Sequence, residues 1–222
     1  AWLLNHRKLL GLQEAAASGG WTQTFHSSRG KSWPGLVSKL EGHAQTLVLV
    51  KTSDDSIFGG FGGATWHRAA QFYTAEEEDG HSSQVFSLHP TVRFHPSTGY
   101  NQNFQYLASG CTSGINPNGV GMGGQVKSFA FFLDASLDEG HSYPSATFNN
   151  LALHATGKEE AAASFDLDVV EIWCPNHVLQ RVAEEEEAAR RRKTNVLQNE
   201  KFKADQMLLA AAGKYQAHHE NA

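Results

Sequence analysis

Short runs of apolar and aromatic residues recur along the first 175 residues, and this pattern predicts strands. The clearest case is the segment 127–134, in which Phe129, Phe131 and Leu133 alternate with a second set that includes Phe132. A strand with two apolar faces is typical of a sheet that is covered on both sides. The same pattern predicts further strands at residues 21–26, 46–51, 84–88, 91–95, 104–108 and 169–174, and one that starts at residue 57.

The density of these strands predicts the fold class. Within the segment 91–95, we expect Val92 and Phe94 to face the core, and Arg93 and His95 to face the solvent. Short strands at this spacing, with few helices between them, are typical of an antiparallel sandwich. We therefore expect an α+β protein: a two-sheet antiparallel β-sandwich with peripheral helices and a C-terminal helical extension.

Helical spacing of apolar residues is confined to a few segments. Residues 2–12 have such spacing and are followed by a flexible Ala-, Ser- and Gly-rich joint. Residues 33–40 predict a second helix, with Ser32 as its N-cap and Pro34 in its first turn. Two charged or Ala-rich stretches without periodicity are expected to be loop insertions between strands: residues 75–83 and 156–164.

The composition changes after Pro175. Glutamates at 184–187 precede a basic run at 190–193, which places acid and base four residues apart and predicts a solvated helix over residues 178–193. A second short helix is expected from about residue 200 to 212, with Gly213 as its C-cap. The chain is therefore divided into an N-terminal helix and linker at 1–20, a domain at 21–175 and a helical arm at 176–222.

A glycine-rich stretch precedes the two-faced strand and predicts a loop. Gly119, Gly121 and Gly124 have the GxGxxG spacing of a dinucleotide site, but that motif must open a helix, and a Phe-rich strand follows here. The glycines are better explained as a bend or bulge in the backbone.

No motif in the sequence requires catalysis or a cofactor. Asp134, Ser136 and Asp138 begin like a calcium loop, but Glu139 stands where that loop requires glycine. The sequence contains no GxSxG elbow and no HExxH pair. We expect no catalytic residues, no metal, no cofactor and no enzymatic activity.

Charge and cysteine content narrow the classes of partner. The formal net charge of −5 gives no basic field for nucleic acid, and no apolar run is long enough to span a bilayer. Cys111 and Cys174 are interpreted as reduced thiols of a cytosolic protein. Because the sequence opens at Ala1, we interpret it as a piece of a longer protein, so membrane association would come from a partner or from a missing N-terminus.

Several side chains are candidates for contact with a protein partner. Phe61 and Trp66 belong to the glycine-rich segment SIFGGFGGATW, and either anchor a partner or pack back onto the core. Met122, within the glycine-rich stretch, is a further candidate. The tail is either an arm or a frayed appendage, and it adds the candidates Arg190, Arg191, Arg192, Phe202, Met207, Leu208 and Leu209.

Six blocks of sequence, taken in order, resemble the TLDc domain family. They are TLVLVKTSDDSIFGGF, VFSLHP, GYNQNFQYL, NPNGVGMGGQ, FAFFLD and FDLDVVEIWCP, and the resemblance covers residues 21–175. The stretches HPSTGYNQNFQYL and NPNGVGMGG, and the tail segment QMLLAAAG, are similar to one subgroup of that family. That subgroup binds the V-ATPase and is linked to lysosomal mTOR signalling.

This resemblance implies a two-sheet β-sandwich without an established catalytic centre. Family members are associated with resistance to oxidative stress and with binding to the cytosolic V1 region of the V-ATPase. It further implies a domain that contacts the catalytic head and peripheral stalk, and a C-terminal helix that reaches the rotor through Phe202, Met207, Leu208 and Leu209. The implied location is cytoplasmic and peripheral, at the lysosomal or vacuolar membrane.

Two other functions are consistent with the sequence. The first is a static component of a larger assembly such as a ciliary axoneme, which copurification with tubulin in place of V-ATPase subunits would reveal. The second is a redox enzyme that uses Cys111 and Cys174, although neither cysteine belongs to a CxxC pair. Unaltered peroxide consumption in a Cys111→Ser, Cys174→Ser double variant would eliminate it.

Overall fold

The computed structural model describes residues 20–73, 83–112, 114–154 and 163–219, and within the last helix it leaves out some side chains. The chain divides into two compact units, Ala1–Leu179 and Gln180–Ala222. The first unit contains all the described strands, and the second contains most of one long helix. Each unit is described by itself.

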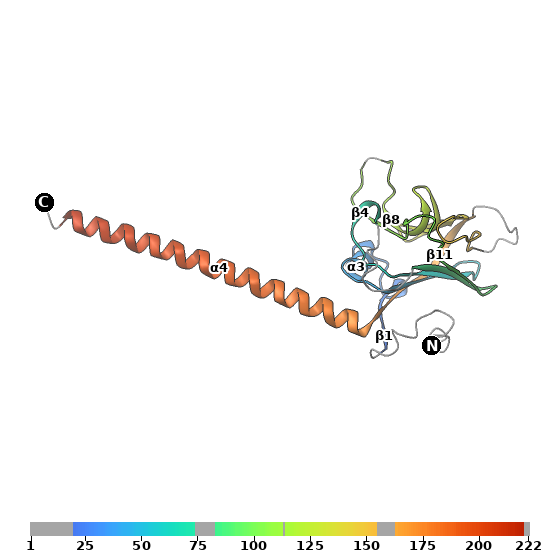
Figure 1. Cartoon of the computed structure of the whole chain (residues 1–222), viewed down its shortest axis with the longest axis horizontal. Coiled ribbons are helices and arrows are strands. Elements are labelled where there is room, and N and C mark those ends of the chain that lie inside the picture. The colour runs from blue at the N-terminus through green and yellow to red at the C-terminus, as the bar shows by residue number, and fades with distance from the viewer. Residues whose placement is uncertain (1–19, 74–82, 113, 155–162, 220–222) are drawn as a thin grey trace. The chain divides into compact units, whose positions relative to one another are not determined.

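The described elements are mostly strands (Figure 1). In chain order they are β1 (Trp21–His26), η1 (Ser27–Arg29), α3 (Trp33–Leu40), β2 (Thr46–Thr52), β3 (Ile57–Gly62), β4 (Ala69–Tyr73), β5 (Gln84–His89), β6 (Arg93–Pro96), β7 (Gln105–Ala108), β8 (Gly119–Gln125), β9 (Ser128–Asp134), β10 (Glu139–Ser142), β11 (Ala163–Pro175) and α4 (Asn176–His219).

The strands form two layers that share β11. Hydrogen bonding runs in the order β4-β7-β8-β9-β10-β11-β2-β3-β5-β6, with β1 paired to β11, and every pairing is antiparallel. The first part of β11 pairs with β10 and its later part with β2, so the sheet folds over on itself (Figure 1). This is the predicted α+β antiparallel sandwich, and the prediction of fold class is confirmed.

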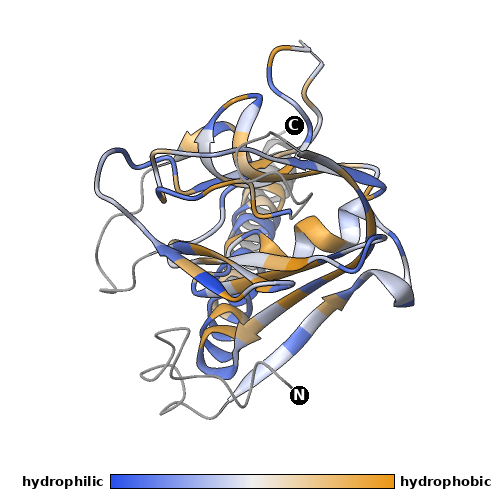
Figure 2. Cartoon of the chain, turned by 90° about the vertical axis from the view of Figure 1, so that its right-hand side faces the viewer, coloured by the Kyte–Doolittle hydropathy of each residue, from blue (hydrophilic) through white to orange (hydrophobic). Residues whose placement is uncertain are grey.

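The core lies between the two layers. Val48 and Phe58 from one layer and Met122 and Phe131 from the other are each fully buried in one cluster, into which α3 also packs. The layers approach closely at Gly60, where a Cβ would collide with the Met122 side chain of the other layer unless that side chain moved. Figure 2 shows the apolar residues along these strands and on α3.

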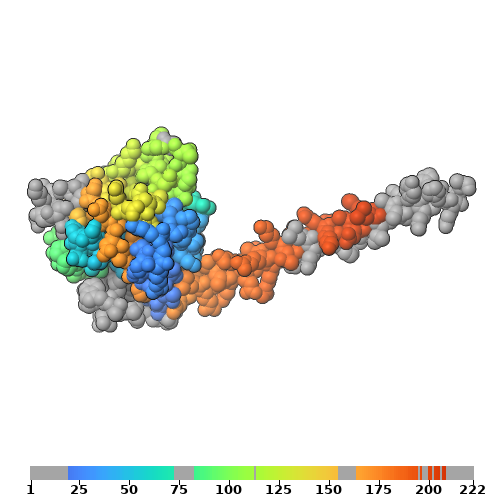
Figure 3. All heavy atoms as spheres, turned by 180° about the vertical axis from the view of Figure 1, so that it is seen from behind, coloured from blue at the N-terminus to red at the C-terminus, as the bar shows by residue number. Residues whose placement is uncertain are grey.

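The N-terminal strand and α3 complete the sandwich beside β11. β1 extends one layer by pairing with the later part of β11, and the Val170 backbone N–H donates to the Ser27 hydroxyl at 3.0 Å. Figure 3 shows these N-terminal segments, in blue, against the orange β11. Ser32 caps α3 by accepting a hydrogen bond from the Gly35 N–H at 3.2 Å, as the sequence predicted.

The structure corrects several local predictions. The glycine-rich stretch is a buried strand, β8, because Gly121 and its neighbours let aromatic rings of β9 lie against the backbone. β4 and β10 were not predicted. Val92 is 47% exposed, so its predicted inward orientation is wrong: it lies in the turn before β6, outside the alternation of that strand.

The tail is one helix where two were predicted. α4 runs for 44 residues from Asn176 to His219 and includes Gly213, which was expected to be a C-cap. An isolated glycine lowers helix stability by only about 1 kcal/mol, and no proline follows it in the helix. The predicted helix at residues 2–12, and nearly all of the two predicted insertions, lie outside the described residues.

Candidate protein-interaction surface

The first turn of α4 is fixed to the sandwich. The Asn176 N–H donates to the Gly20 carbonyl at 3.0 Å, and the Thr22 hydroxyl donates to the Asn176 side-chain oxygen at 2.6 Å. Val178 is 1% exposed and so belongs to the core of the first unit. The helix therefore begins within that unit and follows β11 without an intervening loop.

Beyond this turn, the described side chains of α4 are mostly exposed. Arg191 Nη2 lies 2.6 Å from Glu187 Oε1, and Arg190 lies 4.0 Å from Glu186, each at the i,i+4 spacing that supports an isolated helix. Exposed ion pairs of this kind contribute about 0.3–0.5 kcal/mol each. The helix is therefore held largely by its own backbone and local pairs.

Among the described side chains of α4, three large apolar ones are exposed to solvent. Val196 is 54% exposed, Met207 75% and Leu208 68%. The adjacent residues Met207 and Leu208 place apolar surface on the helix, with charged residues preceding them at 201, 203 and 205. A helix that lays such a patch into a groove is a recurrent mode of protein recognition.

The candidate residues of the sandwich have a different position. Phe61, Trp66 and Met122 are 3%, 0% and 0% exposed, so they cannot offer their side chains to a partner in this conformation. Phe61 packs edge-on against Trp21, and the Trp66 indole N–H donates to the Thr46 hydroxyl. The structure thus favours the alternative in which the rings of Phe61 and Trp66 pack back onto the core, and Met122 is buried as well.

The candidate residues of the tail whose side chains the structure describes are all exposed. Arg190, Arg191 and Arg192 are exposed on α4, as are Met207 and Leu208. The side chains of two further candidates lie outside the described set: Phe202 and Leu209. The structure thus brings the apolar pair and the basic run onto one helix, about four to five turns apart.

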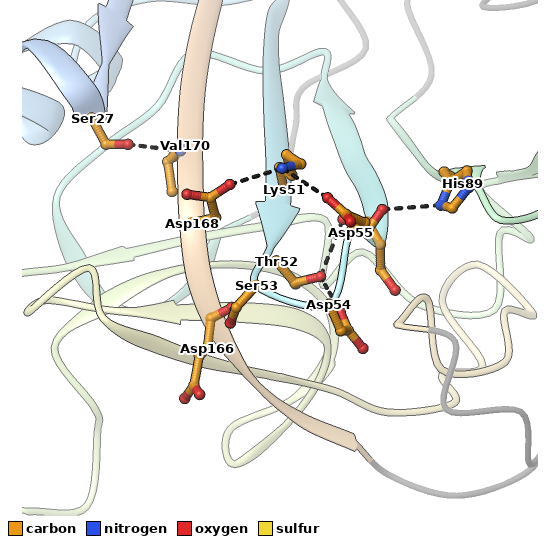
Figure 4. A network of polar contacts seen from close by, with 11 residues as sticks. Ser27, Lys51, Thr52, Ser53, Asp54, Asp55, His89, Asp166, Asp168 and Val170 are labelled. Carbon is orange, nitrogen blue, oxygen red and sulfur yellow. Dashed lines mark hydrogen bonds and ion pairs between the residues drawn. The ribbon is translucent and has the colours of Figure 1, made fainter.

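A polar network at the turn between β2 and β3 was not predicted (Figure 4). Lys51 Nζ lies 2.9 Å from both the Asp55 and the Asp168 carboxylates. The Asp168 hydrogen bond, and then that of Asp55, raises the pKa of Lys51 above its ordinary value. In return, the hydrogen bond from Lys51 lowers the pKa of Asp55.

Asp54, in the same turn, is paired with a buried histidine. Its carboxylate accepts from the Thr52 hydroxyl at 2.5 Å and lies 2.8 Å from His154 Nε2. The Thr52 hydrogen bond is the main cause of the lowered pKa of Asp54. Because a carboxylate only accepts, the hydrogen shared with His154 is assigned to Nε2, and Nδ1 has no partner among the described atoms.

This network fastens a turn and presents acidic groups. Ser53 donates twice to the Asp166 carbonyl of β11, through its N–H at 3.0 Å and its hydroxyl at 3.1 Å. The SDDS sequence signalled the turn, but nothing local signalled a contact between Asp54 and His154, one hundred positions apart. Among the described residues, no hydroxyl or thiol nucleophile is hydrogen-bonded to His154.

An open hollow of about 410 Å³ lies beside β10. It is lined by Phe132, Asp134, Glu139, Gly140, His141, Ser164, Phe165 and Asp166, so three carboxylates border it. The His141 ring stacks on Phe132, and burial lowers its pKa. Within the described ranges, no three His, Cys, Asp or Glu side chains are grouped as metal ligands.

The two cysteines are unequally accessible. Cys111 is half-buried and Cys174 is fully buried. In the part of the chain that the structure describes, no helix is long and apolar enough to cross a membrane.

The sandwich with its shared β11 agrees with the sequence comparison. The family model of the TLDc domain matches residues 9–175, three quarters of the chain, and the chain belongs to this family. The most similar relatives include the MTOR-associated protein MEAK7 of Xenopus laevis, 34% identical over 169 residues, which are 72% of this chain and 34% of the relative.

Relatives with the same name occur in other vertebrates. MEAK7 of Gallus gallus is 32% identical over 157 residues, covering 69% of this chain and 31% of the relative. MEAK7 of Homo sapiens is 28% identical over 154 residues, covering 69% and 32%. The chain spans about a third of the length of these curated relatives.

Proposed function

We propose that this chain is a non-enzymatic protein-binding module that docks on the cytosolic V1 region of a V-ATPase and bridges to a second subunit through α4. Membership of the TLDc family, and relatives named for association with mTOR, support a regulatory role linked to lysosomal mTOR signalling. The partners are protein subunits: the catalytic head and a peripheral stalk for the sandwich, and the rotor for the helix.

The observation that carries the proposal is the exposure of Met207 and Leu208, at 75% and 68%, on a helix whose first turn is hydrogen-bonded to the sandwich. Burial of two such side chains against a partner contributes on the order of 1.5–3 kcal/mol each when complete. In the free chain these exposed side chains contribute no burial free energy, and they would do so only in contact with a partner.

Binding alone is sufficient to act on a rotary motor. A body attached to the stationary part and a helix attached to the rotating part resist rotation mechanically, without transforming a substrate. The buried positions of Phe61, Trp66 and Met122 leave the tail as the described surface best suited to the second contact.

The test compares V1 binding by the full chain, a chain truncated after Leu179, and a Met207→Ala, Leu208→Ala double variant. Alanine keeps the helix, so only apolar contact is removed. We expect the double variant to bind roughly thirtyfold more weakly, the factor that corresponds to about 2 kcal/mol of lost contact. The truncated chain is expected to remain folded and to bind at least as weakly.

A matched variant, Lys201→Ala with Lys203→Ala, removes two exposed side chains of similar length from the same stretch and is expected to bind like the original chain. Absence of V1 binding by the full chain would refute docking. Equal binding by the full and truncated chains would refute the bridging role of α4 while leaving the docking of the sandwich in place.

A further inference from the structure

The order of charges in the central part of α4 would match that of a second copy of the same helix running antiparallel to it. Four glutamates at 184–187 precede Ala188 and Ala189, and four bases at 190–193 follow them. A second helix running in the opposite direction across the two alanines would place its acids beside these bases and its bases beside these acids. A helix running in parallel would place like charges together.

The same part of α4 has a face with a seven-residue repeat. Val182, Ala189 and Val196 are spaced by seven residues, which places them along one side of a helix. Val182 is half-buried, Ala189 is exposed and Val196 is 54% exposed. A small residue at the centre of this face allows the backbones of two helices to approach closely at their midpoint.

Several charged side chains that border this face form no ion pair within the described part of the chain. The ion pairs within the described helix join Glu186 to Arg190, at 4.0 Å, and Glu187 to Arg191. Among the described residues, Glu185, Arg192 and Lys193 have no ion pair. These groups lie three and four positions after Val182 or Ala189, where they border the repeat on a helix surface.

We propose that two copies of this chain associate through antiparallel pairing of α4 about a two-fold axis at Ala189. In this register Val182 lies opposite Val196 of the partner subunit, and Ala189 lies opposite its own equivalent. Glu185 then faces Lys193 of the partner subunit, and Glu186 faces Arg192 of the partner subunit. The two-fold axis repeats every contact, as in other isologous dimers.

This interface is small and strongly electrostatic. Three apolar residues from each copy bury little surface, and exposed ion pairs add roughly 0–1 kcal/mol each. The dimer is therefore expected to be reversible and weakened by salt. Met207 and Leu208 lie beyond the paired segment, since Asn176 of the partner subunit falls opposite Phe202 in this register, so the inference is independent of the proposed V1 contact.

Sedimentation equilibrium of the full chain at low and high salt tests the proposal. We expect a monomer–dimer equilibrium at low salt that shifts toward monomer over about a tenfold increase in salt. The chain truncated after Leu179 is expected to be monomeric throughout. A full chain that stays monomeric at every concentration, or a truncated chain that dimerises equally, would overturn the proposal.

Block exchanges test the charge complementarity itself. One variant replaces every base of the central block with glutamate, and another replaces every acid with lysine: R190E/R191E/R192E/K193E and E184K/E185K/E186K/E187K. Each alone is expected to be monomeric, and an equimolar mixture is expected to form a heterodimer. Failure of the mixture to associate, with helicity confirmed by circular dichroism of that mixture, would contradict the pairing.

A cysteine at the centre tests the register. In a Cys111→Ser background, we expect Ala189→Cys to form a disulfide-linked dimer at least about tenfold faster than Thr194→Cys, an exposed position on the opposite side of the helix. Equal rates at the two positions would refute pairing about Ala189. None of these measurements uses V1, so their outcome is separate from that of the proposed function.

Discussion

The sandwich and α4 differ in how they place their large apolar side chains. The sandwich closes around Phe58, Phe131 and Trp66, each fully buried, and at some of its glycines, such as Gly59, a Cβ would clash with the neighbouring strand. α4 keeps Met207 and Leu208 in solvent, supported by local ion pairs. The sandwich therefore buries its large apolar side chains within the chain, whereas Met207 and Leu208 of α4 remain available for contact with a partner.

The largest contrast is expected from removing one large apolar side chain in each region. Phe131→Ala should lower the free energy of unfolding by about 3–5 kcal/mol, because it empties a fully buried site between the layers. Leu208→Ala should change it by no more than about 0.5 kcal/mol, because the side chain is exposed. Chemical denaturation followed by tryptophan fluorescence measures both.

A loss of several kcal/mol in Leu208→Ala would show that the end of α4 is packed in the free chain. That outcome would remove the contrast between the two regions, and with it the main support for the bridging role of the helix.

A glycine-to-alanine pair sharpens the comparison with a single chemical change. A Cβ at Gly59 would lie 2.0 Å from the Val48 carbonyl oxygen of the next strand, so Gly59→Ala should cost about 3 kcal/mol or fail to fold. Gly213→Ala lies within α4 and should raise helix stability by up to about 1 kcal/mol. Thermal denaturation and helicity by circular dichroism report the two effects, and changes of equal sign would contradict this account.

A smaller effect is expected from the turn that fastens β2 to β11. The folded-state pKa of Asp54 is lowered, chiefly by Thr52, whereas an unfolded Asp titrates near pH ~3.9. The unfolded state therefore binds more protons as the pH falls below about 4, and the stability from this group is present at neutral pH and lost in acid.

Asp54→Asn should accordingly destabilise the sandwich at pH 7 by no more than about 1 kcal/mol, since the carboxylate is 54% exposed and screened by water. The difference between the variant and the original chain should shrink as the pH falls below about 4. Urea denaturation midpoints at several pH values measure it, and a difference that grows in acid would contradict the assigned direction of the pKa shift.

The smallest effect is expected within α4 itself. Arg191→Ala removes the 2.6 Å contact with Glu187 and should reduce the helicity of the tail by an amount that corresponds to about 0.3–0.5 kcal/mol. Circular dichroism in low salt should show the loss, and high salt should abolish the difference. A difference that salt leaves unchanged would mean that Arg191 acts through packing.

The sequence revealed β2 and β9 because each is a short, nearly continuous run of apolar residues, which is typical of a strand buried on both faces. β8 escaped prediction because glycines carry no apolar signal, and its burial is decided by the rings of β9 that lie over it. β10 is only four residues long and polar in sequence, so its pairing with β9 and β11 is decided by tertiary context.

For the candidate contact residues too, local sequence predicted some features and left others to the tertiary fold. Phe61 and Trp66 belong to one glycine-rich segment, which is compatible in sequence both with a projecting loop and with a tightly packed core, and the fold buries both side chains. On the tail, the thin apolar pattern correctly indicated a solvated helix, but no local signal distinguished one helix from two. The pairing of Asp54 with His154 depends on long-range geometry that no spacing encodes.

Hydrogen–deuterium exchange of the full chain, alone and with purified V1, tests the central claim most directly. Alone, the strands of the sandwich should exchange slowly, and the end of α4 around Met207 and Leu208 should exchange quickly, because few contacts there oppose local opening. On addition of V1, this end of α4 should become protected. Unchanged exchange at Met207 and Leu208 in the presence of bound V1 would contradict the claim that the end of α4 binds another protein.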